Sequence, residues 1–270
     1  MTVSAHTPDD RPGPVPRQPW RGQALLRPGH LIYRGMVGPT GSHAHHAVQI
    51  LAAATPLNLT DAADHTVNTT AAVIPANTRH RITGNTALAV MVYLDPSTTA
   101  AHLTGRLDGD PADARRWASA GVHLAGAAGT LTDLPIAEVL PRLLHLLIPS
   151  GGHHRSSTPP AHPAVTRALA DIERRLPNGT VRLGDVATAV GLSPDRLAHL
   201  LTAALGLPFR PYVRWRRLQI AIAHVAAGTT LTSAAHAAGF ADSAHLTRTS
   251  HRTFGLAPST LTGVHFLTDR

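Results

Sequence analysis

The sequence contains no cysteine and no lysine, and only 4% of its 270 residues are aromatic. Without cysteine there can be no disulfide bond, which fits a reducing, cytoplasmic compartment. No apolar run approaches the roughly 18 residues of a membrane helix, so no membrane partner is expected. The N-terminal segment is rich in proline and lacks the apolar region of a secretory signal. We therefore expect neither a secreted disulfide scaffold nor a helical membrane protein.

The charge of the chain comes from arginine alone and is unevenly distributed. The net charge is +8, and residues 161–270 hold 12 arginines against 6 acids, whereas residues 1–160 hold 12 against 10. The absence of lysine beside abundant alanine is typical of a GC-rich, bacterial genome. A basic C-terminal region predicts contact with nucleic-acid phosphates, and the alternative is a merely solvated surface.

The texture of the chain predicts an α+β protein with several parts. We expect a flexible arm at 1–22, a β-rich domain at 23–105, a helical connector or dimerisation segment at 106–148, a linker at 149–162 and an all-helical region at 163–268. The second of these parts should be a small antiparallel barrel or sandwich. Its strands are expected at 31–37, 47–53, 71–75 and 87–94.

The connector carries an apolar stripe with helical spacing. Its members are Ile136, Val139, Leu140, Leu143, Leu144 and Leu147. Such a stripe usually packs against its own domain, and the sharper alternative is a helix that forms a homodimer.

The C-terminal region contains an internal repeat with well-marked helix ends. Residues 185–209 and 233–258 each read as a short Ala-rich helix, a glycine turn and a second helix that ends at glycine. Ser193, Thr232 and Asp242 are candidate N-caps. Two copies of this pattern, joined by one long helix at 211–228, are typical of two helix-turn-helix motifs that present their second helices to DNA major grooves.

Three segments, 191–201, 206–221 and 237–258, resemble the AraC/XylS family of transcription regulators. The resemblance covers about 100 residues and implies recognition helices at about 194–205 and 243–254, an interaction with double-stranded DNA and contact with RNA polymerase. The implied DNA-contacting residues are Asp195, Arg196 and His199 in the first recognition helix, Ser243, Ala244, Thr247, Arg248 and His251 in the second, and Arg214 and Arg217 in the joining helix. Arg248 could grip a guanine bidentately.

Two positions depart from the family pattern. His199 stands where an arginine is usual, so base recognition by the first helix should be weaker or sensitive to pH. Ser250 stands where an aromatic residue is usual, which should thin the local core, and its hydroxyl could bond back to a helix carbonyl.

The N-terminal domain resembles the cupin barrels that serve as sensors in such regulators. The motif that the resemblance places at His43, His45 and Gln49 has glutamine where cupins use glutamate, and a second motif runs from Pro75 to His80. Alternate strand residues point the same way, so His43, His45 and Gln49 could face the interior and meet His80 from a neighbouring strand. Asn77, in place of a glycine, should adopt the left-handed conformation. His46 should point outward.

These four side chains suit a divalent transition metal ion such as Zn, Fe, Ni or Mn. The alternatives are a pocket whose histidines bind an organic effector, and a structural or solvated cluster. For the whole chain, the leading hypothesis is a regulator whose cupin-like domain senses a metal or small molecule and which is not an enzyme. The alternatives are a metal-dependent cupin enzyme and a constitutive DNA-binding protein with a vestigial barrel.

Overall fold

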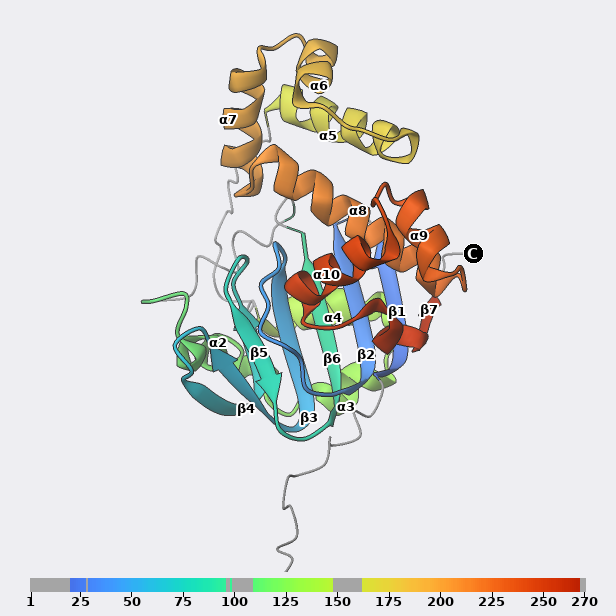
Figure 1. Cartoon of the computed structure of the whole chain (residues 1–270). Helices are drawn as coiled ribbons and strands as arrows, with labels where there is room; N and C mark the ends of the chain where they lie inside the picture. Colours follow the sequence, from blue (N-terminus) through green and yellow to red (C-terminus); the bar gives the residue numbers. More distant parts are fainter. Residues whose placement is uncertain (1–19, 28, 96–97, 99–108, 148–161, 268–270) are drawn as a thin grey trace, which may run out of the picture.

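The computed structural model describes residues 20–27, 29–95, 98, 109–147 and 162–267. A seven-stranded sheet occupies the lower half of the molecule in Figure 1, with helices on both faces and a group of helices above it. The strands are β1 (Arg21–Arg27), β2 (His30–Val37), β3 (Val48–Asp61), β4 (Thr66–Ile74), β5 (His80–Thr83), β6 (Ala87–Leu94) and β7 (Gly263–Leu267). The expected flexible arm lies largely outside the described residues, although Trp20 is buried and β1 already begins at Arg21.

The sheet is antiparallel except at one edge. Its order is β4-β3-β6-β2-β1-β7, with β5 paired to β3. Only β7 runs parallel to its neighbour, with Gly263 opposite Arg21 and Leu267 opposite Leu25. The α+β fold class and the antiparallel N-terminal domain are thus confirmed. The predicted strands at 31–37 and 87–94 match β2 and β6, and those at 47–53 and 71–75 cover parts of β3 and β4.

The prediction that residues 163–268 are all helix is wrong at its end. Gly263–Leu267 is β7, a strand that adds to the N-terminal sheet through β1. Val264 and Phe266 alternate with His265 along this segment, and a two-residue period suits a strand. Because β7 lies about 240 residues from β1 in the sequence, local patterns could not reveal the pairing.

One face of the sheet is covered by the helices that follow it in sequence. These are α3 (Ala128–Asp133) and α4 (Ile136–Leu147), whereas α2 (Ala114–Ala120) buries Trp117 in a different cluster, with Leu57 and Ile82 of the sheet. Ile136, Val139, Leu143 and Leu147 of α4 are buried in one cluster with Ile32, Ile50 and Val92 of the sheet. The predicted apolar stripe therefore packs within its own domain. The same face of α4 is not available to form a homodimer.

The C-terminal helices divide between two places. The helices α5 (Pro163–Arg175), α6 (Leu183–Val190) and α7 (Pro194–Leu205) surround a core of their own. The long helix α8 (Phe209–Ala226) leads from them to α9 (Leu231–Ala237) and α10 (Ser243–Phe254), which lie over the other face of the sheet (Figure 1). Trp215, Ile222, Phe240 and Phe254 share a buried cluster with the sheet residues Tyr33, Met91 and Tyr93.

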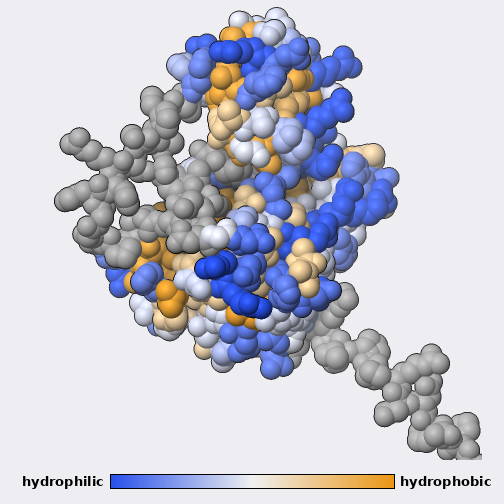
Figure 2. All heavy atoms as spheres, turned by 90° about the vertical axis from the view of Figure 1, so that its left-hand side faces the viewer, coloured by the Kyte–Doolittle hydropathy of each residue, from blue (hydrophilic) through white to orange (hydrophobic). Residues whose placement is uncertain are grey.

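Seen from the side on which α7 lies, the first group of helices forms a lobe above the body that contains the sheet (Figure 2). Hydrophilic residues cover much of this face, and apolar residues appear between them in small groups. No helix among the described residues is long and apolar enough to cross a membrane.

Candidate functional site

The two halves of the internal repeat adopt the same local geometry. Ser193 caps α7 by accepting a hydrogen bond from the Arg196 N–H at 3.3 Å, and Asp242 caps α10 by accepting one from the His245 N–H at 2.5 Å. Both helices end at a left-handed glycine, Gly206 with φ 64° and Gly255 with φ 68°. The predicted caps Ser193 and Asp242 and the helices predicted at 194–205 and 243–254 are confirmed, but α9 is capped by Thr230 and not by Thr232.

The residues predicted to contact DNA lie on the outer sides of the two recognition helices. On α7, Asp195, Arg196 and His199 are exposed, and the His199 ring binds the Asp195 carbonyl through Nδ1 at 2.8 Å. On α10, Ala244, Arg248 and His251 are exposed, whereas Ser243 and Thr247 are half-buried. Each recognition helix therefore presents a polar face, and its contacts with individual bases stay predictions.

The two arginines predicted on α8 differ in their surroundings. The Arg217 guanidinium donates to the Gly239 carbonyl at 3.1 Å and to the Gly179 carbonyl at 2.7 Å, so it joins α8 to the turn after α9 and to the segment between α5 and α6. This bracing role was not predicted, because both acceptors are backbone oxygens remote in sequence. Arg214 is exposed and lies beside the sheet domain, at a pocket that also involves α10.

Ser250 occupies a buried position near the end of α10. Its hydroxyl donates to the Leu256 carbonyl at 2.8 Å, a bond that runs forward across the Gly255 turn. The expected bond back to a helix carbonyl is therefore wrong. The serine instead satisfies a carbonyl beyond the helix end, where no intrahelical donor remains.

The four predicted metal ligands come together inside the sheet domain. His43, His45 and His80 offer ring nitrogens that all lie within 4.8 Å of one another, and they form the one such group found among the described residues. The fourth residue, Gln49, places Oε1 at 2.8 Å from His45 Nε2 and at 3.0 Å from His80 Nε2. All four side chains are buried. Asn77 has φ 63°, as predicted, and its Oδ1 binds the outward His46 at Nδ1.

The protein holds each imidazole by its other nitrogen. The Nδ1 atoms of His43, His45 and His80 contact the carbonyls of Gly41, Ala47 and Thr78 at 2.9, 2.7 and 2.9 Å. Such bonds fix the ring orientation and place the proton on Nδ1, which is the usual arrangement behind metal-binding histidines. The Nε2 atom of each ring then carries no proton, and its lone pair could bind a metal ion.

Burial keeps these three histidines neutral. Desolvation, helped by the neighbouring His45, lowers the pKa of His43 to about 3. Desolvation likewise lowers the pKa of His45 and holds that of His80 well below its usual value. A neutral imidazole has a single N–H. If that proton lies on Nδ1, the Nε2 atoms of His45 and His80 both face an oxygen of Gln49 without a hydrogen between them.

Two arrangements would avoid this contact between lone pairs. A cation between the rings would accept the lone pairs of Nε2 and of Gln49 Oε1 together. Alternatively, the Gln49 amide turns over, so that its NH2 group donates to both rings, since oxygen and nitrogen of an amide are assigned by their hydrogen bonds. A glutamate at this position could act only in the first way.

The loop that carries two of these histidines contacts the end of the second recognition helix. The Gly41 N–H donates to the Gly255 carbonyl at 2.9 Å, and the Ala44 N–H donates to the Arg252 carbonyl at 3.2 Å. A Cβ atom at Gly255 would lie 2.7 Å from His43 Nδ1 and would also collide with the Gly41 carbonyl. We call these contacts the Gly41–Gly255 clamp. Sequence reasoning did not find it, because only glycine backbone forms the closest approach.

An aromatic chain runs beside the clamp. The His45 and Tyr93 rings meet edge to face at 5.1 Å, and Tyr93 meets Phe254 of α10 at 5.8 Å. Phe254 in turn lies 5.8 Å from Trp215, whose indole N–H donates to Asp95 Oδ2 at 3.0 Å. The histidine cluster is thus connected to α8 and α10 by packed side chains as well as by the backbone.

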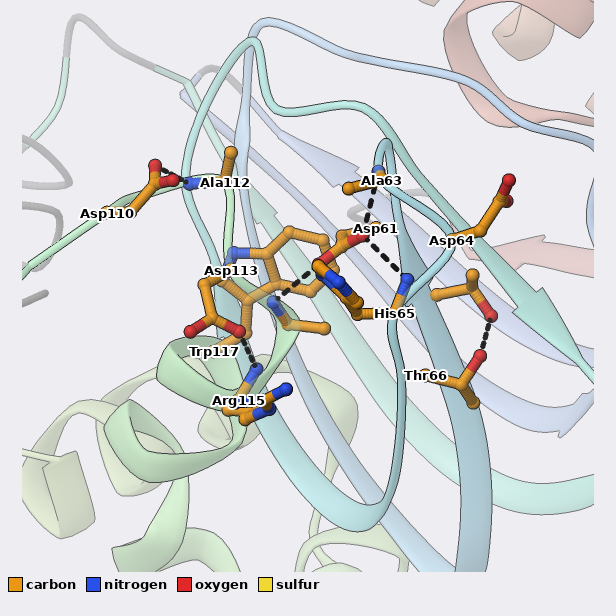
Figure 3. Close-up of polar contacts among 12 residues, drawn as sticks. Asp61, Ala63, Asp64, His65, Thr66, Asp110, Ala112, Asp113, Arg115 and Trp117 are labelled. Carbon is orange, nitrogen blue, oxygen red and sulfur yellow. Dashed lines mark hydrogen bonds and ion pairs between the residues drawn. The ribbon is translucent and has the colours of Figure 1, made fainter.

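A second polar cluster surrounds Asp61 at the far end of β3 (Figure 3). Asp61 Oδ1 accepts from the Ala63 and His65 N–H groups at 2.8 and 3.0 Å, and Oδ2 accepts from the Ala114 N–H at 3.3 Å. Burial alone would raise the pKa of Asp61, but these backbone donors outweigh it and lower the pKa. The nearby Asp110 and Asp113 likewise bind backbone N–H groups of Ala112 and Arg115. This cluster fastens a turn to the start of α2.

Comparisons with known proteins agree with this architecture. Residues 186–263 match the family model described as a helix-turn-helix domain. The structure of an apo form of ToxT from Vibrio cholerae, carrying a single substitution, aligns with a TM-score of 0.50 and 11% identity over 86% of this chain and 96% of that chain. An AraC-type DNA-binding domain-containing regulator from Chromobacterium violaceum is 24% identical over 37% of this chain and 89% of that chain, with a TM-score of 0.36. No curated protein matches.

The fold and the matched segment define a protein with an N-terminal sheet domain and a C-terminal helix-turn-helix domain. That C-terminal domain is a helix-turn-helix domain similar to those of AraC-type regulators, and helix-turn-helix domains bind double-stranded DNA. The predicted resemblance is therefore confirmed. The metal, the effector and the contacts of individual side chains with DNA are separate questions.

Proposed function

We propose that this chain is a DNA-binding transcriptional regulator, and that its sheet domain is a sensor that binds one divalent transition metal ion through His43, His45, Gln49 and His80. The observation that carries this proposal is the arrangement of the three rings, each anchored by Nδ1 to a carbonyl, with the Nε2 atoms of His45 and His80 directed at Gln49 Oε1. Imidazole and amide ligands suit Zn, Ni and Fe. A bound ion would accept the Nε2 and Oε1 lone pairs that otherwise face one another in the buried cluster.

The consequence for DNA binding follows from the position of the cluster. The strand pairing that joins His43 to His80, with N–H to carbonyl distances of 2.9 Å in both directions, lies next to the Gly41–Gly255 clamp. An ion that ties His43 to His80 would stiffen the loop that holds the end of α10. Metal would then alter DNA affinity if it binds the clamped and released states unequally.

The first test is the metal content of the untagged protein beside that of His45→Ala/His80→Ala. The proposal expects about one equivalent per chain, lost in the double variant. His46→Ala/His65→Ala is the matched control, because it also removes two histidines but from side chains outside the cluster. Metal retained in the first variant, or lost equally in the control, contradicts the proposal.

A second variant distinguishes a bound cation from a turned Gln49 amide. Gln49→Glu should raise metal affinity, since a carboxylate is the stronger ligand, and metal should restore the stability of this variant. If the amide network is the native state and no ion binds, Gln49→Glu leaves a buried carboxylate facing two lone pairs. The variant is then destabilised whether or not metal is added.

The regulatory role itself is tested by DNA shift assays with and without the bound ion. A change in affinity on metal removal supports a sensor, whereas equal affinity supports the constitutive DNA-binding alternative. The contacts with RNA polymerase and with a second subunit stay predictions.

A further inference from the structure

A pocket of about 190 Å³ lies where the sheet domain meets the second helix-turn-helix half. One wall is the loop that contains Ala44 and His46, and the others are formed by Arg214 of α8 and by Thr249 and Arg252 of α10. The pocket lies outside the histidine cluster, although the same loop contributes to both. None of the four predicted metal ligands lines it.

The charge of this pocket is unbalanced. Two arginines line it, and no carboxylate does so among the residues that the structure describes. Other arginines nearby are paired: Arg216 binds Glu173 with a shortest N–O distance of 2.6 Å, and Arg175 binds Asp171 at 2.5 Å. Within the described part of the chain, Arg214 and Arg252 have neither an ion pair nor a side-chain hydrogen bond. Two guanidinium groups that share a pocket without a counter-charge favour an anionic occupant.

A buried hydroxyl adds an independent observation. Thr249 is 1% exposed and lines the pocket, and its Oγ1 has no hydrogen-bond partner among the described residues. Leaving a buried polar group unpaired is costly, so such groups generally have a ligand or a water as partner. A threonine on a helix can return this bond to the preceding turn, as Thr247 does to the Ser243 carbonyl at 2.8 Å. Thr249 does not, and its Oγ1, which neighbouring atoms cover in this structure, would gain a partner if a small movement of the pocket wall brought it into contact with a bound group.

We infer that this pocket binds one oxyanion, a phosphate or carboxylate group of a small molecule, between Arg214, Arg252 and Thr249. Its volume is below the roughly 300–1,000 Å³ of pockets for drug-sized ligands, which suits a single anionic group. Arginine matches both groups, since its planar fork bonds two oxygens at once. Because one wall belongs to the sheet domain and the others to α8 and α10, the anion holds the two domains together. The inference does not depend on the metal proposal.

The test uses the full chain without DNA and titrates inorganic phosphate and, separately, acetate by calorimetry. Sodium chloride keeps the ionic strength constant. The inference expects saturable binding of at least one of the two anions, with a dissociation constant on the order of 1 mM. Arg214→Ala/Arg252→Ala should raise that constant by at least about tenfold. Arg142→Ala/Arg210→Ala is the matched control, because it removes the same charge from exposed positions outside the pocket.

Thr249→Val guards against a variant that merely misfolds. Valine keeps the shape of threonine, so without added anion the unfolding midpoint should stay equal or rise as the unpaired hydroxyl disappears. Anion affinity should nevertheless fall by about threefold.

Three results would overturn the inference. The first is the absence of saturable binding of either anion by the natural protein. The second is an equal loss of affinity in the control variant. The third is a loss of DNA affinity in Arg214→Ala/Arg252→Ala without any anion binding to the DNA-free protein, which would make the two arginines contacts to DNA phosphates.

Discussion

The two helix-turn-helix halves are alike in local structure and different in attachment. Both recognition helices end at a left-handed glycine, but a Cβ atom at Gly206 would meet nothing within 4 Å, whereas one at Gly255 would meet the sheet domain. The first half packs around its own core, and the second shares its core with the sheet and donates β7 to it. The sheet domain thus holds α10 directly, and among the described residues its packing reaches α7 through α8.

This difference has a consequence for signalling. The loop at 41–45 is hydrogen-bonded directly to the end of α10, so a change in the loop alters these bonds. Among the described residues, no backbone hydrogen bond joins this loop to α7. Similar local structure therefore does not imply equal regulation. If the sheet domain is the sensor that we propose, the second half is the one that responds to it directly, and the first half is the one that is presented to DNA without contact to the sensor loop.

The largest loss of stability should come from replacing the glycines that end the two recognition helices, Gly206 and Gly255. Gly206→Ala should cost about 1 kcal/mol, the strain of a left-handed alanine. Gly255→Ala should cost about 3 kcal/mol, because the same strain is joined by a collision with the backbone at Gly41. Urea denaturation of the two variants measures both losses. Equal losses would mean that the clamp contributes nothing.

A smaller effect is expected from the bond between α8 and the sheet. Trp215→Phe keeps most of the packing but removes the indole N–H from the buried Asp95 carboxylate, which should cost about 2 kcal/mol. The loss should appear as weaker protection of α8 and α10 in hydrogen exchange. Unchanged protection there, with a loss confined to α5–α7, would reverse the roles that we assign to the two halves.

On DNA the two halves should differ in how they read sequence. Arg248→Ala should weaken binding to a specific operator by about 1–3 kcal/mol and weaken non-specific binding less, if the guanidinium grips a guanine. Arg196→Ala on α7 is the matched change. Competition shift assays against random DNA measure both. Equal specific and non-specific losses for Arg248→Ala would make it a phosphate contact.

The smallest effect should come from Asp61, which lies away from both halves. Its pKa is lowered in the folded protein, so its stabilisation is present above the unfolded pKa of about 3.9 and is lost as the pH falls through the lower folded value. Asp61→Asn should cost about 1 kcal/mol at neutral pH. The difference from the natural protein should shrink as the pH falls below the unfolded pKa and should vanish once Asp61 is protonated in the folded protein as well. A difference that stays constant throughout acid titration would show that the charge plays no part.

Local rules were sufficient for much of the second domain. The caps at Ser193 and Asp242 and the stops at Gly206 and Gly255 follow from side-chain capping and from the left-handed conformation, both of which are short-range. The same holds for Asn77. The cluster of His43, His45, Gln49 and His80 was also predictable, because strand alternation and a family resemblance together indicated which side chains face inward.

Long-range contacts were not predictable in this way. The pairing of β7 with β1 and the Gly41–Gly255 clamp join segments about 200 residues or more apart, and the clamp is made by backbone atoms. Arg217 was predicted to contact DNA, yet its guanidinium is occupied by two carbonyls. Nothing in the spacing of the arginines distinguishes it from Arg214. The partners of such side chains depend on how the domains meet, which short sequence patterns do not encode.

The most direct test of the central claim is hydrogen exchange of the full chain with and without zinc, read separately for peptides from α7 and α10. We predict that zinc raises the protection of residues 41–45 and of the end of α10 around Gly255, and leaves residues 194–205 unchanged. Equal changes in both recognition helices, or no change near Gly255, would contradict this claim.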